Sequence, residues 1–173
     1  MKSANAQQVC PQCGAVTDNV EGPVHEYMLS SPGCWKTFGG ILAKEYSDPE
    51  YRKVHRLTVD TYACQHGGED PRANQSVNVH LVALYLALEE KLPPDKIPRI
   101  MELVIQKNKI KFEALKMPSF EHALTVTDIV MAKSAKEHCG LVSNWAVTVW
   151  NAWWTEHQRI KELAKSALNN LRE

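Results

Sequence analysis

Three cysteines near the N-terminus have the spacing of a metal-binding motif. Cys10 and Cys13 are separated by two residues, so both thiolates can face one ion from a tight turn. Gly14 follows directly, and glycine lets the backbone close such a turn. Cys34 adds a third soft ligand from a second predicted turn that leads into a helix. Structural zinc sites are built from four cysteine or histidine ligands, so this pattern predicts a structural Zn²⁺ site.

The sequence leaves three candidates for the fourth ligand: His66, His25 and Cys64. His25 lies between Cys13 and Cys34, so proximity along the chain favours it. Geometry favours His66, because an antiparallel hairpin of the two helices that follow Cys34 would place residues 62–66 beside that cysteine. Cys64 would lie at the same end of the hairpin. We rank His66 first, His25 second and Cys64 third.

The remaining histidines allow a different kind of site. His55 and His80 fall on two predicted helices, and together with His157 or Glu156 they could hold a catalytic metal between helices. No His-Glu-x-x-His spacing accompanies them, so we favour hydrogen-bonded core or boundary positions for His55 and His80. His122 and His138 are predicted to be surface residues in a loop or at a helix end. A metal-dependent hydrolase or transferase that uses His55 and His80 is the alternative function.

Hydrophobic spacing indicates the elements that must position these residues. Residues 1–33 contain many prolines and glycines and little periodicity, which predicts an irregular segment that a metal would pin down. The only strand-like run, 123–130, has no partner. Later segments have apolar residues at helical spacing. They predict helices over 35–46, 49–66, 75–91, 98–107 and 110–115, another from Thr125 or Thr127 to His138, and a long helix over 141–169.

These elements predict an all-α fold, a helical bundle with an irregular, metal-pinned N-terminal segment. A chain of 173 residues suits a single domain, with a zinc-knuckle lobe over 1–34 and the bundle over 35–173. Four tryptophans crowd the last predicted helix, and most of them are expected in the core. Any indole left exposed would mark a groove or a homo-oligomer interface. The four are Trp145, Trp150, Trp153 and Trp154.

Charge and composition argue against several classes of function. Lys plus Arg and Asp plus Glu each number 20, so the formal net charge is zero and no nucleic-acid partner is expected. The one basic run, 107–111, suits a solvated helix face. No apolar stretch is long enough to span a bilayer, so no membrane association is expected. Five cysteines, an odd number, do not suit a secreted disulfide framework, and we expect a cytoplasmic protein.

Motifs spread over most of the chain carry a resemblance. They are Cys-Pro-x-Cys-Gly from Cys10, Gly-Cys-Trp around Cys34, and Val-His-Arg-Leu-x-Val-Asp-x-Tyr-x-x-Gln-His from Val54 to His66. In these motifs the chain resembles an uncharacterised, mostly bacterial domain-of-unknown-function family. That family often has a proline after the last histidine, where this chain has Gly67. Some members lack a residue that matches His25, which favours His66 as the ligand.

The resemblance implies no activity, so the predicted function comes from the site itself. A four-ligand zinc site without a visible catalytic set predicts a non-catalytic protein that acts by binding, as an adaptor or a homo-oligomer. The sequence does not identify the small molecule or protein that it binds.

Overall fold

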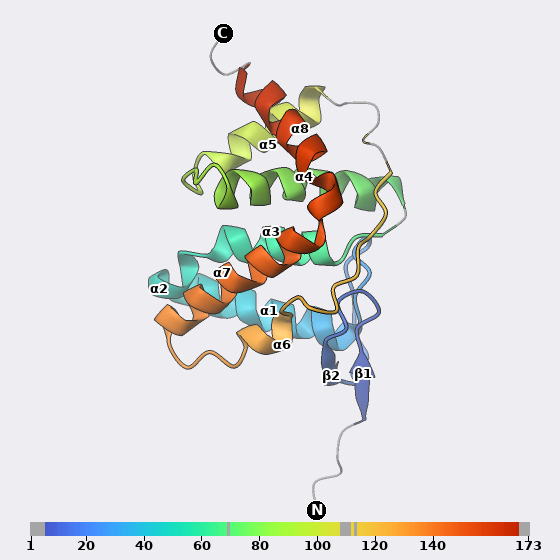
Figure 1. The fold of residues 1–173 in the computed structure, drawn as a ribbon. Coiled ribbons are helices and arrows are strands. Elements are labelled where there is room, and N and C mark those ends of the chain that lie inside the picture. Colours follow the sequence, from blue (N-terminus) through green and yellow to red (C-terminus); the bar gives the residue numbers. More distant parts are fainter. Residues whose placement is uncertain (1–5, 69, 108–111, 113, 170–173) are drawn as a thin grey trace, which may run out of the picture.

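Helices dominate the computed structural model, which describes residues 6–68, 70–107, 112 and 114–169. The predicted all-α class is confirmed (Figure 1). One short hairpin, β1 (Gln7–Val9) and β2 (Val16–Asp18), is the only sheet in the described residues. The helices of this part of the chain are α1 (Pro32–Ser47), α2 (Pro49–Arg52), α3 (His55–Gln65), α4 (Pro71–Leu88), α5 (Ile97–Lys107), α6 (Val126–Ile129), α7 (Ala135–Ala152) and α8 (His157–Asn169), with a 3-10 turn, η1, at Trp154–Glu156.

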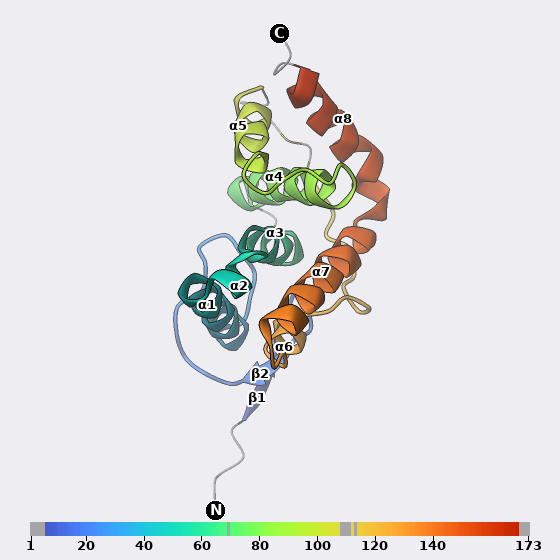
Figure 2. The same ribbon diagram turned by 90° about the vertical axis from the view of Figure 1, so that its left-hand side faces the viewer.

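Helix α3 lies in the middle of the molecule and packs against α1, α4 and α7 (Figure 2). Helices α5 and α8 pack against α4 and against each other on the side away from α1. The β1–β2 hairpin lies at the opposite end, where β2 contacts α1 (Figure 1). Among the described residues, no helix has the length and apolar character needed to cross a bilayer.

Capping residues explain where the first helices begin. The Ser31 side chain accepts a hydrogen bond from the Cys34 amide at 3.2 Å, and a proline follows it, so α1 begins before the predicted start at residue 35. Asp48 caps α2 in the same way, as its sequence context predicted. Asp70 caps α4, which therefore begins at Pro71 and not at residue 75.

Three predicted helices are divided in the structure. The helix predicted over 49–66 is interrupted at residues 53–54, which separates α2 from α3. The helix predicted to reach His138 is wrong, because α6 ends at Ile129 and the Ser134 side chain caps the start of a new helix, α7. The helix predicted over 141–169 breaks at η1, where the His157 ring stacks on Trp150 and donates to its carbonyl. The helix predicted over 110–115 and the basic run at 107–111 fall largely outside the described residues.

Buried tryptophans in α7 and directly after it fix the position of α3. The Trp145 indole donates to the Gln65 side chain at 3.0 Å, and the Trp153 indole donates to the Cys64 carbonyl at 3.1 Å. Both side chains are almost completely buried, and each has its polar atom satisfied. The expected exposed indole is Trp154, which is 72% exposed. Helix α7 therefore holds the C-terminal end of α3, where His66 follows.

Candidate metal centre

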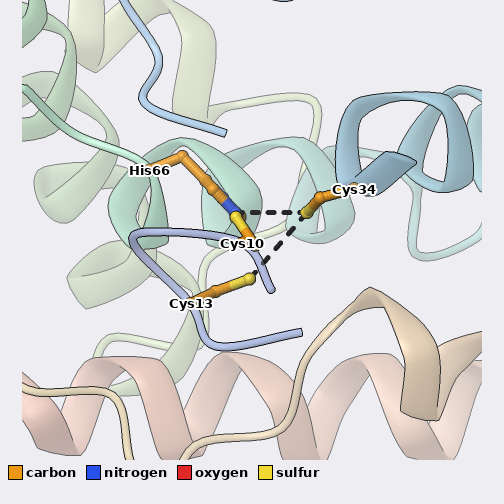
Figure 3. A group of neighbouring side chains, drawn as sticks. All are labelled: Cys10, Cys13, Cys34 and His66. Carbon is orange, nitrogen blue, oxygen red and sulfur yellow. Dashed lines mark hydrogen bonds between the residues drawn. The ribbon is translucent and has the colours of Figure 1, made fainter. Parts of the chain in front are cut away.

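Four buried side chains from three separate segments meet at one point (Figure 3). Their donor atoms, three sulfurs and one imidazole nitrogen, all lie within 4.8 Å of one another. The cysteine sulfurs of Cys13 and Cys34 are 3.8 Å apart, and Cys34 Sγ lies 3.4 Å from His66 Nε2. Each of the four residues is at most 5% exposed. The group, called here the Cys₃His cluster, consists of Cys10, Cys13, Cys34 and His66.

The spacing of the donor atoms fits a tetrahedral ion. Zinc binds sulfur at about 2.3 Å and nitrogen at about 2.0 Å. A tetrahedron with these bond lengths has S–S edges of about 3.8 Å and S–N edges of about 3.5 Å. The separations in the cluster, 3.8 Å between Cys13 and Cys34 and 3.4 Å between Cys34 and His66, agree with both edges. The residues present therefore fit a metal ion of this size.

The turn that carries Cys10 and Cys13 joins the two strands of the hairpin. The Cys10 amide donates to the Ala15 carbonyl at 2.8 Å, and the Gly14 amide donates to the Cys10 carbonyl at 3.0 Å. Gly14 has a φ of +74°, a conformation that a side chain would strain. The Ala15 amide points at Cys13 Sγ from 3.5 Å. Within the segment predicted to be irregular, residues 7–18 thus form a β-hairpin whose turn carries two of the sulfurs, and residues 19–31 form no helix or strand.

Cys34 is held by the first turn of α1. It lies three residues after Ser31, whose hydroxyl accepts the Cys34 amide proton. The N-terminal end of a helix carries a partial positive charge, which favours a thiolate at this position. The start of α1 therefore orients the Cys34 sulfur.

His66 lies at the C-terminal end of α3 with one ring nitrogen already occupied. Its Nδ1 atom donates to the Tyr62 carbonyl at 2.9 Å, which leaves Nε2 to face the three sulfurs. Such a backbone partner sets the tautomer of metal-binding histidines. The Tyr62 ring stacks on the imidazole at a centroid distance of 3.8 Å, and its hydroxyl lies 3.6 Å from Cys34 Sγ. Tyr62 is a supporting residue that the sequence analysis did not identify as part of the site.

Three thiols at this distance resist simultaneous ionisation in the absence of a cation. Hydrogen bonds from Cys13 and Cys34 hold the pKa of the Cys10 thiol well below its usual range. The same hydrogen bond to Cys10 raises the pKa of Cys13 to about 12 and raises that of Cys34 well above its usual range. A bound divalent ion removes this conflict, because it deprotonates the thiols that coordinate it.

The two other candidates for the fourth position lie elsewhere. The His25 ring packs edge-on against Trp35 and Tyr27, and its Nδ1 accepts the Tyr27 amide at 3.4 Å. Cys64 is completely buried, and burial raises the pKa of its thiol. Neither residue belongs to the Cys₃His cluster.

The structure does not bring His55, His80 and His157 to a common point. His55 Nδ1 donates to Glu45, whereas His80 Nδ1 donates to Asp60. His157 is bound to the backbone of α7. The Cys₃His cluster is the only group found in the described residues with the spacing of a metal site. Hydrogen-bonded boundary positions, which we favoured, describe His55 and His80 correctly.

His138 was placed incorrectly by the sequence analysis. It is only 2% exposed, and its Nε2 donates to the Glu45 carboxylate at 2.8 Å. Glu45 is itself completely buried and also accepts from His55 and Thr58. Its position on α1 resembled that of any charged helix residue, so the sequence carried no signal of this network. His122 is exposed, as predicted.

A family match covers most of the chain, including all four cluster residues. Residues 8–154 match the model of a family of unknown function (DUF5946). The chain belongs to the DUF5946 family. The predicted resemblance to a domain-of-unknown-function family is therefore confirmed. The DUF5946 match includes the whole Cys₃His cluster and α1 to α7, whereas α8 lies beyond it. No curated protein and no solved structure matches the chain.

Gly33 offers a test of how α1 supports the cluster. A Cβ atom at this position would lie 2.3 Å from Thr17 Oγ1 and 2.4 Å from the Asp18 carbonyl, both on β2. We expect Gly33→Ala to push the hairpin away from α1, to lower the free energy of unfolding by about 1–3 kcal/mol and to weaken metal retention. Chemical denaturation and metal analysis of the purified variant measure both effects.

Gly40, on the exposed side of the same helix, is the matched control. A Cβ atom there would meet nothing within 4 Å. Gly40→Ala is expected to raise the free energy of unfolding by up to about 1 kcal/mol, because alanine favours the helix. Equal effects of the two substitutions would contradict the close packing of β2 against α1.

Proposed function

We propose that Cys10, Cys13, Cys34 and His66 bind one structural Zn²⁺ and that the protein acts by binding, not by catalysis. The observation that carries the proposal is the convergence of three buried sulfurs and one imidazole nitrogen within 4.8 Å. Thiolate and imidazole ligands in a tetrahedral arrangement favour zinc over magnesium, calcium or manganese. Four protein ligands leave no open position for a substrate, which is typical of a structural site.

The ion would act as a cross-link. It would join the hairpin turn, the start of α1 and the end of α3, three segments that are far apart along the chain. The backbone adds one further connection, from the Leu29 amide to the His66 carbonyl at 3.0 Å. Thiolate ligands require a reducing compartment, which suits the cytoplasmic location expected from the composition.

Exposed apolar side chains on α7 and η1 support a role in binding. Trp154 is 72% exposed and Val147 is 44% exposed. Large apolar side chains at a surface often mark a contact with another molecule. A second copy of this chain or an unrelated protein would be a suitable partner, in keeping with an adaptor or a homo-oligomer.

Metal analysis tests the ligand set directly. We expect elemental analysis of the purified protein to give one zinc per chain. His66→Ala is expected to lower the retained zinc severalfold, since the loss of one ligand opens the site. His25→Ala is the matched control and is expected to retain a full equivalent. The opposite result would assign the fourth position to His25: His25→Ala would lose its zinc and His66→Ala would keep a full equivalent.

Cobalt substitution provides a second readout. Co²⁺ in place of zinc is expected to give the intense visible absorption of a tetrahedral thiolate site, and this band should weaken in Cys13→Ser. A His55→Ala/His80→Ala variant should keep both the zinc content and the cobalt spectrum. Loss of a second, exchangeable metal in that double variant would instead favour a metal-dependent enzyme.

A further inference from the structure

A surface pocket of about 370 Å³ lies beside α4, and none of its lining residues belongs to the Cys₃His cluster. Its walls come from Tyr27 in the loop after the hairpin, from Ile105 on α5 and from one face of α4. Arg72, Ser76 and His80 lie on that face at intervals of four residues, so they point the same way. Three polar side chains on one helix thus face a common space.

His80 is held from behind by a buried carboxylate. Its Nδ1 atom donates to Asp60 Oδ1 at 2.6 Å, and the Asp60 side chain is only 2% exposed. The second oxygen of Asp60 accepts from Arg56 Nε at 2.8 Å. With Nδ1 occupied, the other ring nitrogen, Nε2, is left for the pocket, and no partner for it is found among the described residues. Asp60 thus positions an imidazole with one unused nitrogen at the pocket wall.

The charges around the pocket favour an anion. The lining residues that the structure describes include one cation, Arg72, and no carboxylate. Glu26 reaches Arg72 from outside the lining at 2.9 Å, but the two side chains are 68% and 69% exposed, so this ion pair is easily broken. Ser76 and Tyr27 add hydroxyl groups that can donate hydrogen bonds. A ligand that carried its own carboxylate or phosphate group would replace Glu26 as the partner of Arg72.

We propose that this pocket binds a small ligand through a carboxylate or phosphate group, which pairs with Arg72 and accepts a hydrogen bond from His80 Nε2. In the complex both ring nitrogens of His80 donate hydrogen bonds, Nδ1 to Asp60 and Nε2 to the bound anion. The site is separate from the proposed zinc centre. It assigns a chemical class of ligand, a small anion, to the binding role proposed above.

Nuclear magnetic resonance of ¹⁵N-labelled histidines tests this inference on the intact, zinc-loaded protein. Inorganic phosphate and acetate serve as probes, with chloride at matched ionic strength as the reference. We expect phosphate, acetate or both to shift the His80 Nε2 resonance in a saturable way, because Nε2 begins to donate a hydrogen bond to the probe. A response to phosphate alone assigns the ligand group as a phosphate, and a response to acetate extends it to carboxylates.

Two surface substitutions with opposite expected effects make the test sharp. Arg72→Gln is expected to weaken phosphate binding about fivefold, because the pocket loses its cation. Glu26→Gln is expected to strengthen it by a similar factor, because Arg72 no longer has a competing partner. Both side chains are largely exposed, so neither change should affect folding. His122→Gln, an exposed histidine outside the pocket, is the control and should leave binding unchanged.

The role of Asp60 has its own signature. Asp60→Asn is expected to release the fixed tautomer, so that the Nδ1 and Nε2 resonances of His80 both shift before any probe is added. A His80 Nε2 resonance that stays fixed at the highest phosphate and acetate concentrations would overturn the proposal. A shift that chloride reproduces, or that is the same in Arg72→Gln and Glu26→Gln, would overturn it as well.

Discussion

Removal of the metal by a strong chelator is expected to unfold the hairpin and the loop that follows it. The fraction of molecules that unfold there should match the fraction of metal removed. The cluster holds these residues to α1 and α3, and the binding free energy of a structural zinc is folding free energy. Cys13→Ser is expected to have the same effect and to lower the free energy of unfolding by about 5 kcal/mol or more. Thermal denaturation and hydrogen exchange of residues 6–31 measure the loss.

Cys139→Ser is the matched control for this substitution. Cys139 lies outside the cluster on α7, partly exposed, and its thiol donates to the Glu50 carbonyl at 3.6 Å. Its replacement is expected to change the free energy of unfolding by no more than about 0.5 kcal/mol. An unchanged melting temperature in Cys13→Ser, with chelator or without it, would count decisively against a structural metal at this cluster.

Glu45→Ala is expected to cause the second large loss of stability, about 3–5 kcal/mol. The completely buried Glu45 carboxylate accepts hydrogen bonds from His138 at 2.8 Å, His55 at 2.9 Å and Thr58 at 2.6 Å. These donors come from α7 and α3, so one side chain of α1 connects three helices. Removal of the carboxylate would leave the buried His138 without its acceptor, whereas Thr58 could still donate to the Val54 carbonyl at 3.2 Å. Urea denaturation at neutral pH measures the effect.

Two further substitutions separate this network from a general effect of charge. Glu45→Gln keeps the shape but brings an amide group against one histidine, and we expect it to cost about 1–3 kcal/mol. Glu102→Ala removes a carboxylate that is 59% exposed and pairs with Arg99, and it should change stability by no more than about 0.5 kcal/mol. If Glu45→Ala and Glu102→Ala had the same free energy of unfolding, the Glu45 network would contribute nothing to stability.

The helical class was predictable because it depends on signals within a few residues of one another. Asp48 followed by Pro49 predicted a helix start that the structure confirms. Apolar residues at helical spacing predicted a helix over 75–91, and Val77, Leu81 and Leu84 in that stretch are buried on α4. Both signals depend on neighbouring residues alone, so contacts with the rest of the chain do not change them.

The ends and breaks of helices were harder to predict, because they depend on contacts made elsewhere. The predicted C-terminal helix breaks where the His157 ring stacks on Trp150 and donates a hydrogen bond to the Trp150 carbonyl. The hairpin at the N-terminus has strands of only three residues each, too short to give an alternating pattern. In both cases the local sequence permits more than one conformation, and packing selects one of them.

The two halves of the candidate site differ in the same way. Cys10 and Cys13 were identified by spacing alone, because a turn with two thiols can face one ion in any fold. The choice of His66 over His25 needed an assumption about a hairpin between helices, and the structure confirms the resulting proximity of Cys34 and His66, 32 residues apart. Metal binding by the four residues stays a prediction.

By itself the sequence determined the helical class, the three cysteines and their suitability for zinc, because each follows from residues that are close along the chain. Only the tertiary structure decided which histidine joins them, and only it revealed that Glu45 binds His138 across 93 residues and that Asp60 holds His80 at a pocket. The physical reason is that a buried polar side chain must find a partner wherever packing places one. Distant partners of this kind leave no pattern in the sequence.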